Sequence, residues 1–217
     1  MAVLASNKAR ILPNWDVVGL IGTGSHDVAV DNIVVPEHWT FVRGGGSSLD
    51  GALYEYPSLS FAAQVLAAVA LGIARAALDE VIAIANGHSS VRASAKSGDR
   101  PYTQIELAKA EADLRSARSW FYEAIDDVWR TLLAGDAPTR EQISLLRLSS
   151  THGTQIAADA ARRVQMLTGM TGVSESSPLA AQVRDAQMIT QHAFLGETTY
   201  QNAGAIFFGL ASLPGYL

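Results

Sequence analysis

The longest regular pattern along the chain is a helical one that begins near Pro57. Apolar side chains recur there at every fourth position, and the positions of this stripe are Phe61, Val65, Val69, Ile73, Ala77 and Val81, widened by Ala62, Leu66 and Leu78. That spacing gathers side chains on one face of a helix, which the pair Asn86 and Gly87 would end. The most apolar window, residues 61–74, is shorter than the roughly 18 residues that a bilayer span needs. We therefore predict a buried core helix and no membrane segment.

Two further long helices are predicted after the first. Residues 103–106 (Thr-Gln-Ile-Glu) have the spacing of a capping box, and an apolar face then continues to Gly135. A second capping box, residues 139–142 (Thr-Arg-Glu-Gln), opens a helix that we expect to reach about residue 167. The middle of this third helix carries two pairs of small residues, which allow another helix to approach closely. These residues are Ala157, Ala158, Ala160 and Ala161.

Two shorter helices complete the pattern. Ser177 followed by Pro178 predicts the start of the fourth helix, because proline is favoured at the first helical position. Gly196 separates this helix from a final short one, which ends before Pro214. Three long helices with short connections and two shorter helices predict an up-and-down helical bundle, so the fold class is mainly α.

The N-terminal part of the chain has a different pattern. Over residues 28–35 most positions are β-branched, and Asp27 and Asp31 are interleaved with them. Pro36 closes the run. This combination predicts a β-strand, so a short β remnant is expected to precede the helices.

A joint separates the β remnant from the helices. Residues 44–48 (Gly-Gly-Gly-Ser-Ser) are typical of a flexible connection. We therefore expect a β segment over residues 1–43, a linker over residues 44–56 and a helical bundle domain over residues 57–217. No internal repeat is visible in the sequence.

Composition excludes several classes of protein. The net charge of -5 and the isoelectric point near 5.5 argue against a surface for nucleic acid or anionic membranes. Only 17% of the residues are charged and 48% are hydrophobic, which favours burial against copies of the same chain. The chain has no cysteine, which excludes disulfides, thiolate catalysis and cysteine metal sites and fits a cytoplasmic enzyme. The five histidines include no helical i, i+4 pair, so we expect no metal site.

Two familiar catalytic motifs are absent although their residue types occur. Gly22 and Gly24 begin a dinucleotide fingerprint, but Asp27 stands in the place of its third glycine and no helix follows. Ser25, His26 and Asp27 are the residue types of a catalytic triad. Adjacent side chains on an extended strand point to opposite faces, so this sequence order argues against a triad.

Two groups of short motifs resemble the acyl-CoA dehydrogenase superfamily. The first group resembles the end of its middle β domain and comprises Trp15, residues 19–28 (Gly-Leu-Ile-Gly-Thr-Gly-Ser-His-Asp-Val) and residues 35–37 (Val-Pro-Glu). The second resembles its last helices and comprises residues 165–169 (Gln-Met-Leu-Thr-Gly), 176–179 (Ser-Ser-Pro-Leu) and 184–187 (Arg-Asp-Ala-Gln), then His192. The resemblance covers essentially the whole chain, but only the C-terminal half or so of a family member.

Within this superfamily the motifs are most similar to the two-component flavin monooxygenases. Those enzymes hydroxylate aromatic or polyketide-like substrates with reduced flavin that a separate reductase supplies. The resemblance thus implies a flavin-dependent oxidoreductase that is a homodimer or homotetramer, binds FAD or FMN and acts on a small aromatic or acyl substrate. Acyl-CoA dehydrogenation of an acyl thioester is one alternative, and a non-catalytic assembly subunit is another.

The resemblance also implies which residues contact the flavin. The implied cofactor-binding residues are Thr23, Gly24, Ser25, Arg92, Gln165, Thr168 and Gly169. Arg92 would meet the flavin phosphates of a neighbouring subunit, a task that suits the bidentate guanidinium. Simpler interpretations stay open: a β-turn in which Gly24 only supplies a positive φ, a solvated Arg92, and a helix C-cap at Gly169.

The catalytic prediction rests on His192. In the monooxygenase branch a histidine at this offset from Arg184 and Asp185 faces the flavin and manages the proton of the oxygen chemistry. Arg184 and Asp185 would position the active-site loop, although a surface ion pair is the alternative. The dehydrogenase carboxylate would fall at about Ala193, which cannot act as a base, and Glu197 is displaced along the chain.

Overall fold

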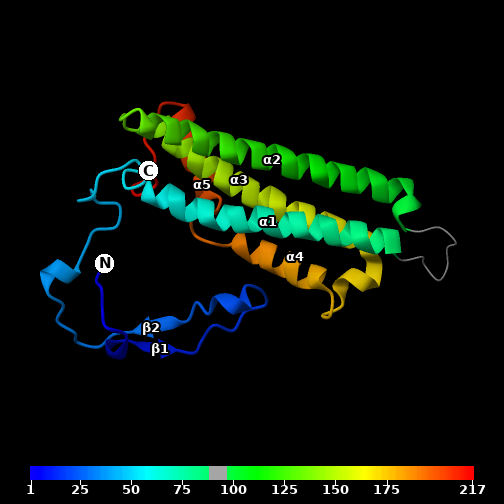
Figure 1. Cartoon of the computed structure of the whole chain (residues 1–217), viewed down its shortest axis with the longest axis horizontal. Coiled ribbons are helices and arrows are strands. Elements are labelled where there is room, and N and C mark those ends of the chain that lie inside the picture. The colour runs from blue at the N-terminus through cyan, green and yellow to red at the C-terminus, as the bar shows by residue number, and fades with distance from the viewer. Residues whose placement is uncertain (88–96) are drawn as a thin grey trace.

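A computed structural model describes residues 1–87 and 97–217 of the chain. Over these residues a two-stranded antiparallel sheet precedes a bundle of helices, and the sheet lies beside one end of the bundle (Figure 1). The elements are β1 (Arg10–Leu12), β2 (Asp27–Ala29), α1 (Ser58–Gly87), α2 (Pro101–Leu133), α3 (Arg140–Gln165), α4 (Pro178–Ile189) and α5 (Thr198–Phe207). The predicted mainly α fold with a short β remnant is confirmed.

Helix α3 occupies the centre of the bundle. It packs against α1, α2, α4 and α5, whereas α1 and α2 contact each other only sparsely. The three long helices run antiparallel in succession, as the colour gradient of Figure 1 shows. This is the up-and-down arrangement that the short connections predicted.

The buried face of α1 is made mostly of alanine, and the first half of the bulkier predicted stripe lies outside it. Ala63, Ala67 and Ala74 are fully buried, whereas Phe61 and Val65 remain about half exposed. Small side chains let α1 approach the alanine-rich middle of α3, and the bulky residues then lie on the outer side of the helix. The prediction that Ala77 and Val81 are buried is correct. The part of the stripe that contains Phe61, Val65 and Val69 was wrongly expected to be buried.

Among the described helices, α1 alone is long and apolar enough to span a bilayer, judged by length and composition only. Nevertheless 44% of its most apolar window is buried inside the protein. Its packing against α3 and α4 makes it the core helix of the bundle, as the sequence pattern predicted.

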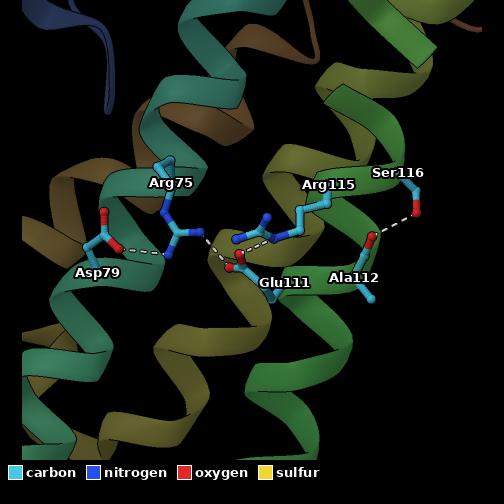
Figure 2. A network of polar contacts seen from close by, with 6 residues as sticks. All are labelled: Arg75, Asp79, Glu111, Ala112, Arg115 and Ser116. Atoms are coloured by element: carbon cyan, nitrogen blue, oxygen red, sulfur yellow. Dashed lines mark hydrogen bonds and ion pairs between the residues drawn. The ribbon is translucent and has the colours of Figure 1, made fainter. Parts of the chain in front are cut away.

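A polar network closes part of the groove between α1 and α2 (Figure 2). Arg75 of α1 donates to Asp79 at 2.7 Å and to Glu111 of α2 at 2.5 Å, and Arg115 donates to the other oxygen of Glu111 at 2.6 Å. The hydrogen bond from Arg75 is the main cause of a lowered pKa of the Glu111 carboxyl. Glu111 is therefore ionised at neutral pH and links the two helices.

Farther along the same groove the lining becomes aromatic. A cavity of about 310 Å³ lies there between the beginning of α1 and the later turns of α2. Its lining includes the half-exposed Phe61 and Val65, together with Tyr56, whose hydroxyl and the side chain of Gln64 are hydrogen-bonded. None of the predicted site residues that the structure describes lines this cavity.

The predicted strand is only partly present. β2 covers Asp27–Ala29 and pairs with β1, so that Ile11 lies opposite Val28. Residues 33–35 form no strand, and Val34 is 93% exposed. A β-strand needs a hydrogen-bonding neighbour, and no described segment pairs with these residues. Their β-branched composition alone was therefore misleading.

One of the two capping boxes is correct. Thr139 accepts from the amide of Gln142 at 3.1 Å, and the Gln142 side chain accepts from the amide of Thr139 at 2.9 Å. The box predicted at Thr103 is wrong, because α2 already begins at Pro101 and Thr103 is buried. Proline is pre-organised for the first turn of a helix, which explains the earlier start.

Replacing Thr139 with alanine is expected to lower the free energy of unfolding by about 1 kcal/mol, because the amide of Gln142 in the first turn of α3 loses its acceptor. Ser177 is a matched control: it is the N-cap residue of α4 but makes no side-chain capping bond, so Ser177→Ala should be nearly neutral. Urea unfolding of the two variants measures the difference. Equal losses of unfolding free energy in Thr139→Ala and Ser177→Ala would contradict the capping role of the Thr139 side chain.

Candidate functional site

The predicted glycine-rich turn is held closed by hydrogen bonds to its own backbone. The carbonyl of Leu20 accepts from Trp15 Nε1 at 3.2 Å and from Thr23 Oγ1 at 2.9 Å. The backbone amide of Trp15 donates to His26 Nδ1 at 2.9 Å. His26 therefore has a structural task, and the structure agrees that it is no part of a triad with its neighbours in sequence. The result is a fixed turn over residues 19–26.

The outer side of this turn is open. Gly24 has φ of 54°, and an added Cβ at Gly24 or Gly22 would meet no atom within 4 Å. The hydroxyls of Thr23 and Ser25 lie 3.1 Å apart on the exposed side. The three residues predicted here to contact a cofactor are thus presented together. Because Thr23 Oγ1 already donates to the Leu20 carbonyl, the hydroxyl proton of Ser25 is the one that can turn from Thr23 to an acceptor on a ligand.

Asp185 fastens the turn to the helical bundle. Its Oδ1 accepts from the amide of Leu20 at 2.6 Å, across 165 positions of sequence. Leu20 adopts a left-handed backbone conformation with φ of 55° to make this contact. At Gly19 the turn presses directly on α4, because a Cβ there would lie 2.8 Å from the backbone carbonyl of Arg184. Asp185 therefore contacts the turn rather than pairing with Arg184, which is exposed.

His192 lies in the segment that follows α4, residues 190–197, which we term the His192 loop. The imidazole is exposed, its Nδ1 accepts from the amide of Phe194 at 3.2 Å, and the two rings lie 4.9 Å apart. An Nδ1 that accepts a hydrogen bond leaves the proton of the neutral imidazole on Nε2. The structure thus assigns an Nε2–H that points away from the backbone contact and is available to a ligand.

The turn and His192 share one end of α4. The turn contacts α4 near Arg184 and Met188, and His192 follows the end of the helix at Ile189 by three residues. Ala193 is exposed and apolar, and Glu197 is the exposed N-cap residue of α5. The described part of the chain therefore presents an imidazole, and not a carboxylate, at the expected catalytic position.

Three further predicted cofactor residues, Gln165, Thr168 and Gly169, lie before the other end of α4. Gln165 donates to the carbonyl of Gly172 at 3.0 Å, and Thr168 donates to the carbonyl of Gln165 at 2.7 Å. Gly169 breaks the helix with φ of 57°. Helix α3 itself ends at Gln165 with Met166 as its C-cap residue, so the C-cap predicted at Gly169 is wrong by three residues, and a cofactor role stays a prediction. A helix of 12 residues, roughly 18 Å long, separates this segment from His192 within one chain. Arg92 lies outside the described residues.

Sequence reasoning missed two participants, Phe194 and Leu20. Phe194 supplies the amide that orients His192, and Leu20 supplies the amide that meets Asp185. Both act through the backbone, so their residue types gave no signal. The left-handed conformation of Leu20 is also one that a leucine rarely adopts.

Comparison with known proteins places this geometry in a family. The pattern of the family described as "Acyl-CoA dehydrogenase, C-terminal domain" matches residues 64–197. The chain is 58% identical over all 217 residues to an indole-3-acetate monooxygenase of Pseudomonas putida and 48% identical to one of Acinetobacter baumannii. In both cases the match covers 100% of this chain and 56% of the relative, so the chain spans just over half the length of these relatives.

Solved structures agree with this assignment. The 3-HSA hydroxylase of Rhodococcus sp. RHA1 superposes with a TM-score of 0.89 at 26% identity, covering 97% of this chain and 57% of the hydroxylase. XiaF from Streptomyces sp., solved with FADH2 and glycerol, gives a TM-score of 0.91 at 22% identity over 100% of this chain and 57% of XiaF, which shows the shared fold. By sequence and by structure, the chain belongs to the acyl-CoA dehydrogenase family and contains its C-terminal helical domain.

Proposed function

We propose that the complete protein is a reduced-flavin-dependent monooxygenase that hydroxylates a small aromatic acid of the indole-3-acetate type. The observation that carries the proposal is the imidazole of His192, fixed at Nδ1 and open at Nε2, with Ala193 beside it where a dehydrogenase needs a carboxylate. The high identity to proteins named indole-3-acetate monooxygenase supports the substrate class.

The residues of the turn fit a flavin. Thr23 and Ser25 place two hydroxyls on an open surface, and the flavin ring presents nitrogen and oxygen acceptors along one edge. Gln165, Thr168 and Arg92 are proposed to serve the phosphate end of FAD or FMN of a neighbouring subunit in a homodimer or homotetramer. Residues 1–43 would then be the end of a β domain, joined through residues 44–56 to the helical domain, residues 57–217.

Reduced flavin supplies, when bound, the two electrons that hydroxylation by O2 requires. The balance is one O2, one substrate C–H and one reduced flavin, giving a hydroxylated product, one water and oxidised flavin. A separate flavin reductase, as in two-component systems, would regenerate the reduced cofactor. His192 would hold or deliver, at Nε2, a proton needed when the second oxygen atom leaves as water. Asp185 would keep the turn in place while this happens.

The test uses the complete gene product with reduced flavin, indole-3-acetate and isotopically labelled O2. We expect labelled oxygen in the aromatic product and near-equal amounts of product and consumed O2. An acyl thioester that reduces the bound flavin without O2 would instead establish dehydrogenation. A complete protein that binds no flavin would establish an assembly role and end the proposal.

A further inference from the structure

A buried arginine stands behind the His192 loop. Arg147 of α3 is only 5% exposed, and it has no carboxylate partner among the described residues. Its Nη1 donates to the carbonyl of Tyr216 at 2.8 Å and its Nη2 to the carbonyl of Phe194 at 3.3 Å. Its Nε is buried without a hydrogen-bond partner. The guanidinium thus ties two distant segments of the chain to the central helix.

Stability alone does not explain a charge at this place. Burying an ion that lacks a counter-ion is costly, and a neutral apolar side chain of similar volume often packs at no loss. Burial lowers the pKa of the Arg147 guanidinium, which is the expected sign of that cost. A methionine at position 147 would have a similar volume, but it would lack the planar guanidinium that donates to two carbonyl oxygens at once.

The contacts of Arg147 lead to His192 through a single residue. Phe194 accepts from Arg147 through its carbonyl and donates through its amide to His192 Nδ1. Two guanidinium groups lie near its ring, with Arg147 at 6.0 Å and Arg43 at 5.6 Å from the ring centre. Phe194 is therefore held at its carbonyl and at its ring, which restrains the adjoining 193–194 peptide group, whose amide orients the imidazole.

We propose that Arg147 is a positioning residue, which fixes the His192 loop so that Nδ1 stays on the Phe194 amide and the Nε2 proton faces the reaction site. This inference rests on the proposed function for the use of that proton, but the positioning itself is a property of the chain. Arg147 is buried behind the His192 loop, and its side chain donates to backbone carbonyls of the chain itself. It acts through Phe194.

Nitrogen-15 spectra of the imidazole rings test the positioning without any cofactor. In the 217-residue chain under alkaline conditions, where imidazole is neutral, His192 should show the single tautomer that is protonated at Nε2. Comparison with His192→Ala identifies its signals. In Arg147→Met these signals should shift toward a mixture of both tautomers, while those of His26, fixed by Trp15, stay unchanged. A tautomer mixture in the unmodified chain would overturn the proposal at once, even if no variant folds.

Two further variants separate positioning from general damage. Arg147→Lys keeps the charge but not the fork, so it should restore the tautomer only in part. Arg140→Met removes an exposed arginine from the first turn of α3, and it should change nothing. Thermal unfolding monitors the fold in each case. A folded Arg147→Lys protein with unaltered His192 signals would contradict the proposal.

In the complete gene product we expect Arg147→Met to lower product formation by up to about 10²-fold, the scale of a misplacement of about 1 Å at a reacting group. The Michaelis constant for the substrate should change little, because the Arg147 side chain is buried behind the His192 loop. A further outcome is that His192 shows the expected single tautomer, and a mixture in Arg147→Met, while the unmodified enzyme hydroxylates nothing. That outcome would refute the proposed function and leave the positioning role intact. Unchanged turnover in a variant with a mixed tautomer would show that the orientation of His192 is irrelevant, and the proposal would fail.

Discussion

Replacing His192 with alanine is expected to uncouple the consumption of O2 from hydroxylation. The complete enzyme should still oxidise reduced flavin, but hydrogen peroxide should accumulate in place of hydroxylated product. The reason is that Nε2 is the donor that the Nδ1 contact leaves free on the exposed His192 side chain, and alanine leaves no group there to manage the proton. Loss of one general acid–base group typically costs about 10²–10⁴-fold in rate. Product formed per O2 consumed is the measurement.

His38 and Glu197 provide the controls for this experiment. His38 is another exposed histidine, in a different part of the chain, so His38→Ala should leave coupling unchanged. Glu197 is the carboxylate that a dehydrogenase would have to use, and Glu197→Gln should leave hydroxylation intact. If His192→Ala keeps normal coupling while Glu197→Gln abolishes activity, the protein is a dehydrogenase and the monooxygenase proposal is wrong.

The helices were predictable because their signals are local. The capping box at Thr139 and the Ser177–Pro178 pair are read within four residues of the chain, and both mark true helix starts. The burial of α1 was harder to predict, since hydrophobicity favours Phe61 and Val65 over alanine. Packing reverses that order here because only a small side chain allows α1 to approach α3 closely. Which face of an apolar helix is buried depends on its neighbour, and the helix's own sequence does not contain that information.

Sequence motifs nominate candidate site residues, but they do not predict how those residues are arranged. The motifs identified Asp185 and His192, but the acceptor role of Asp185 depends on a backbone amide 165 positions away. Arg147 gave no usable signal, because a single arginine in a long helix is usually exposed. Its partners are backbone carbonyls, which every residue type carries. The sequence therefore indicates chemistry at named side chains, while the fold determines which backbone groups orient them.

Replacing Gly19 with alanine is expected to release the turn from α4. The new Cβ would lie 2.8 Å from the backbone carbon and oxygen of Arg184 and 3.0 Å from Met188 Cγ, and the backbone of a helix cannot move aside. The turn must lift instead, which breaks the 2.6 Å bond from the Leu20 amide to Asp185. Forcing an extra carbon into such a contact costs about 1–3 kcal/mol. Asp185→Ala should release the same segment by removing the acceptor.

Hydrogen exchange at the amides of residues 15–26 measures this release. In the unmodified chain the Leu20 amide should be protected, and in Gly19→Ala and Asp185→Ala its exchange should rise together with that of its neighbours. Gly22→Ala is the matched control, because it adds the same methyl group to the same turn where no atom lies within 4 Å. It should leave exchange unchanged. Continued protection of Leu20 in Gly19→Ala would show that the turn stays on α4 despite the added methyl group. Continued protection in Asp185→Ala would show that Asp185 is not the group that positions the turn.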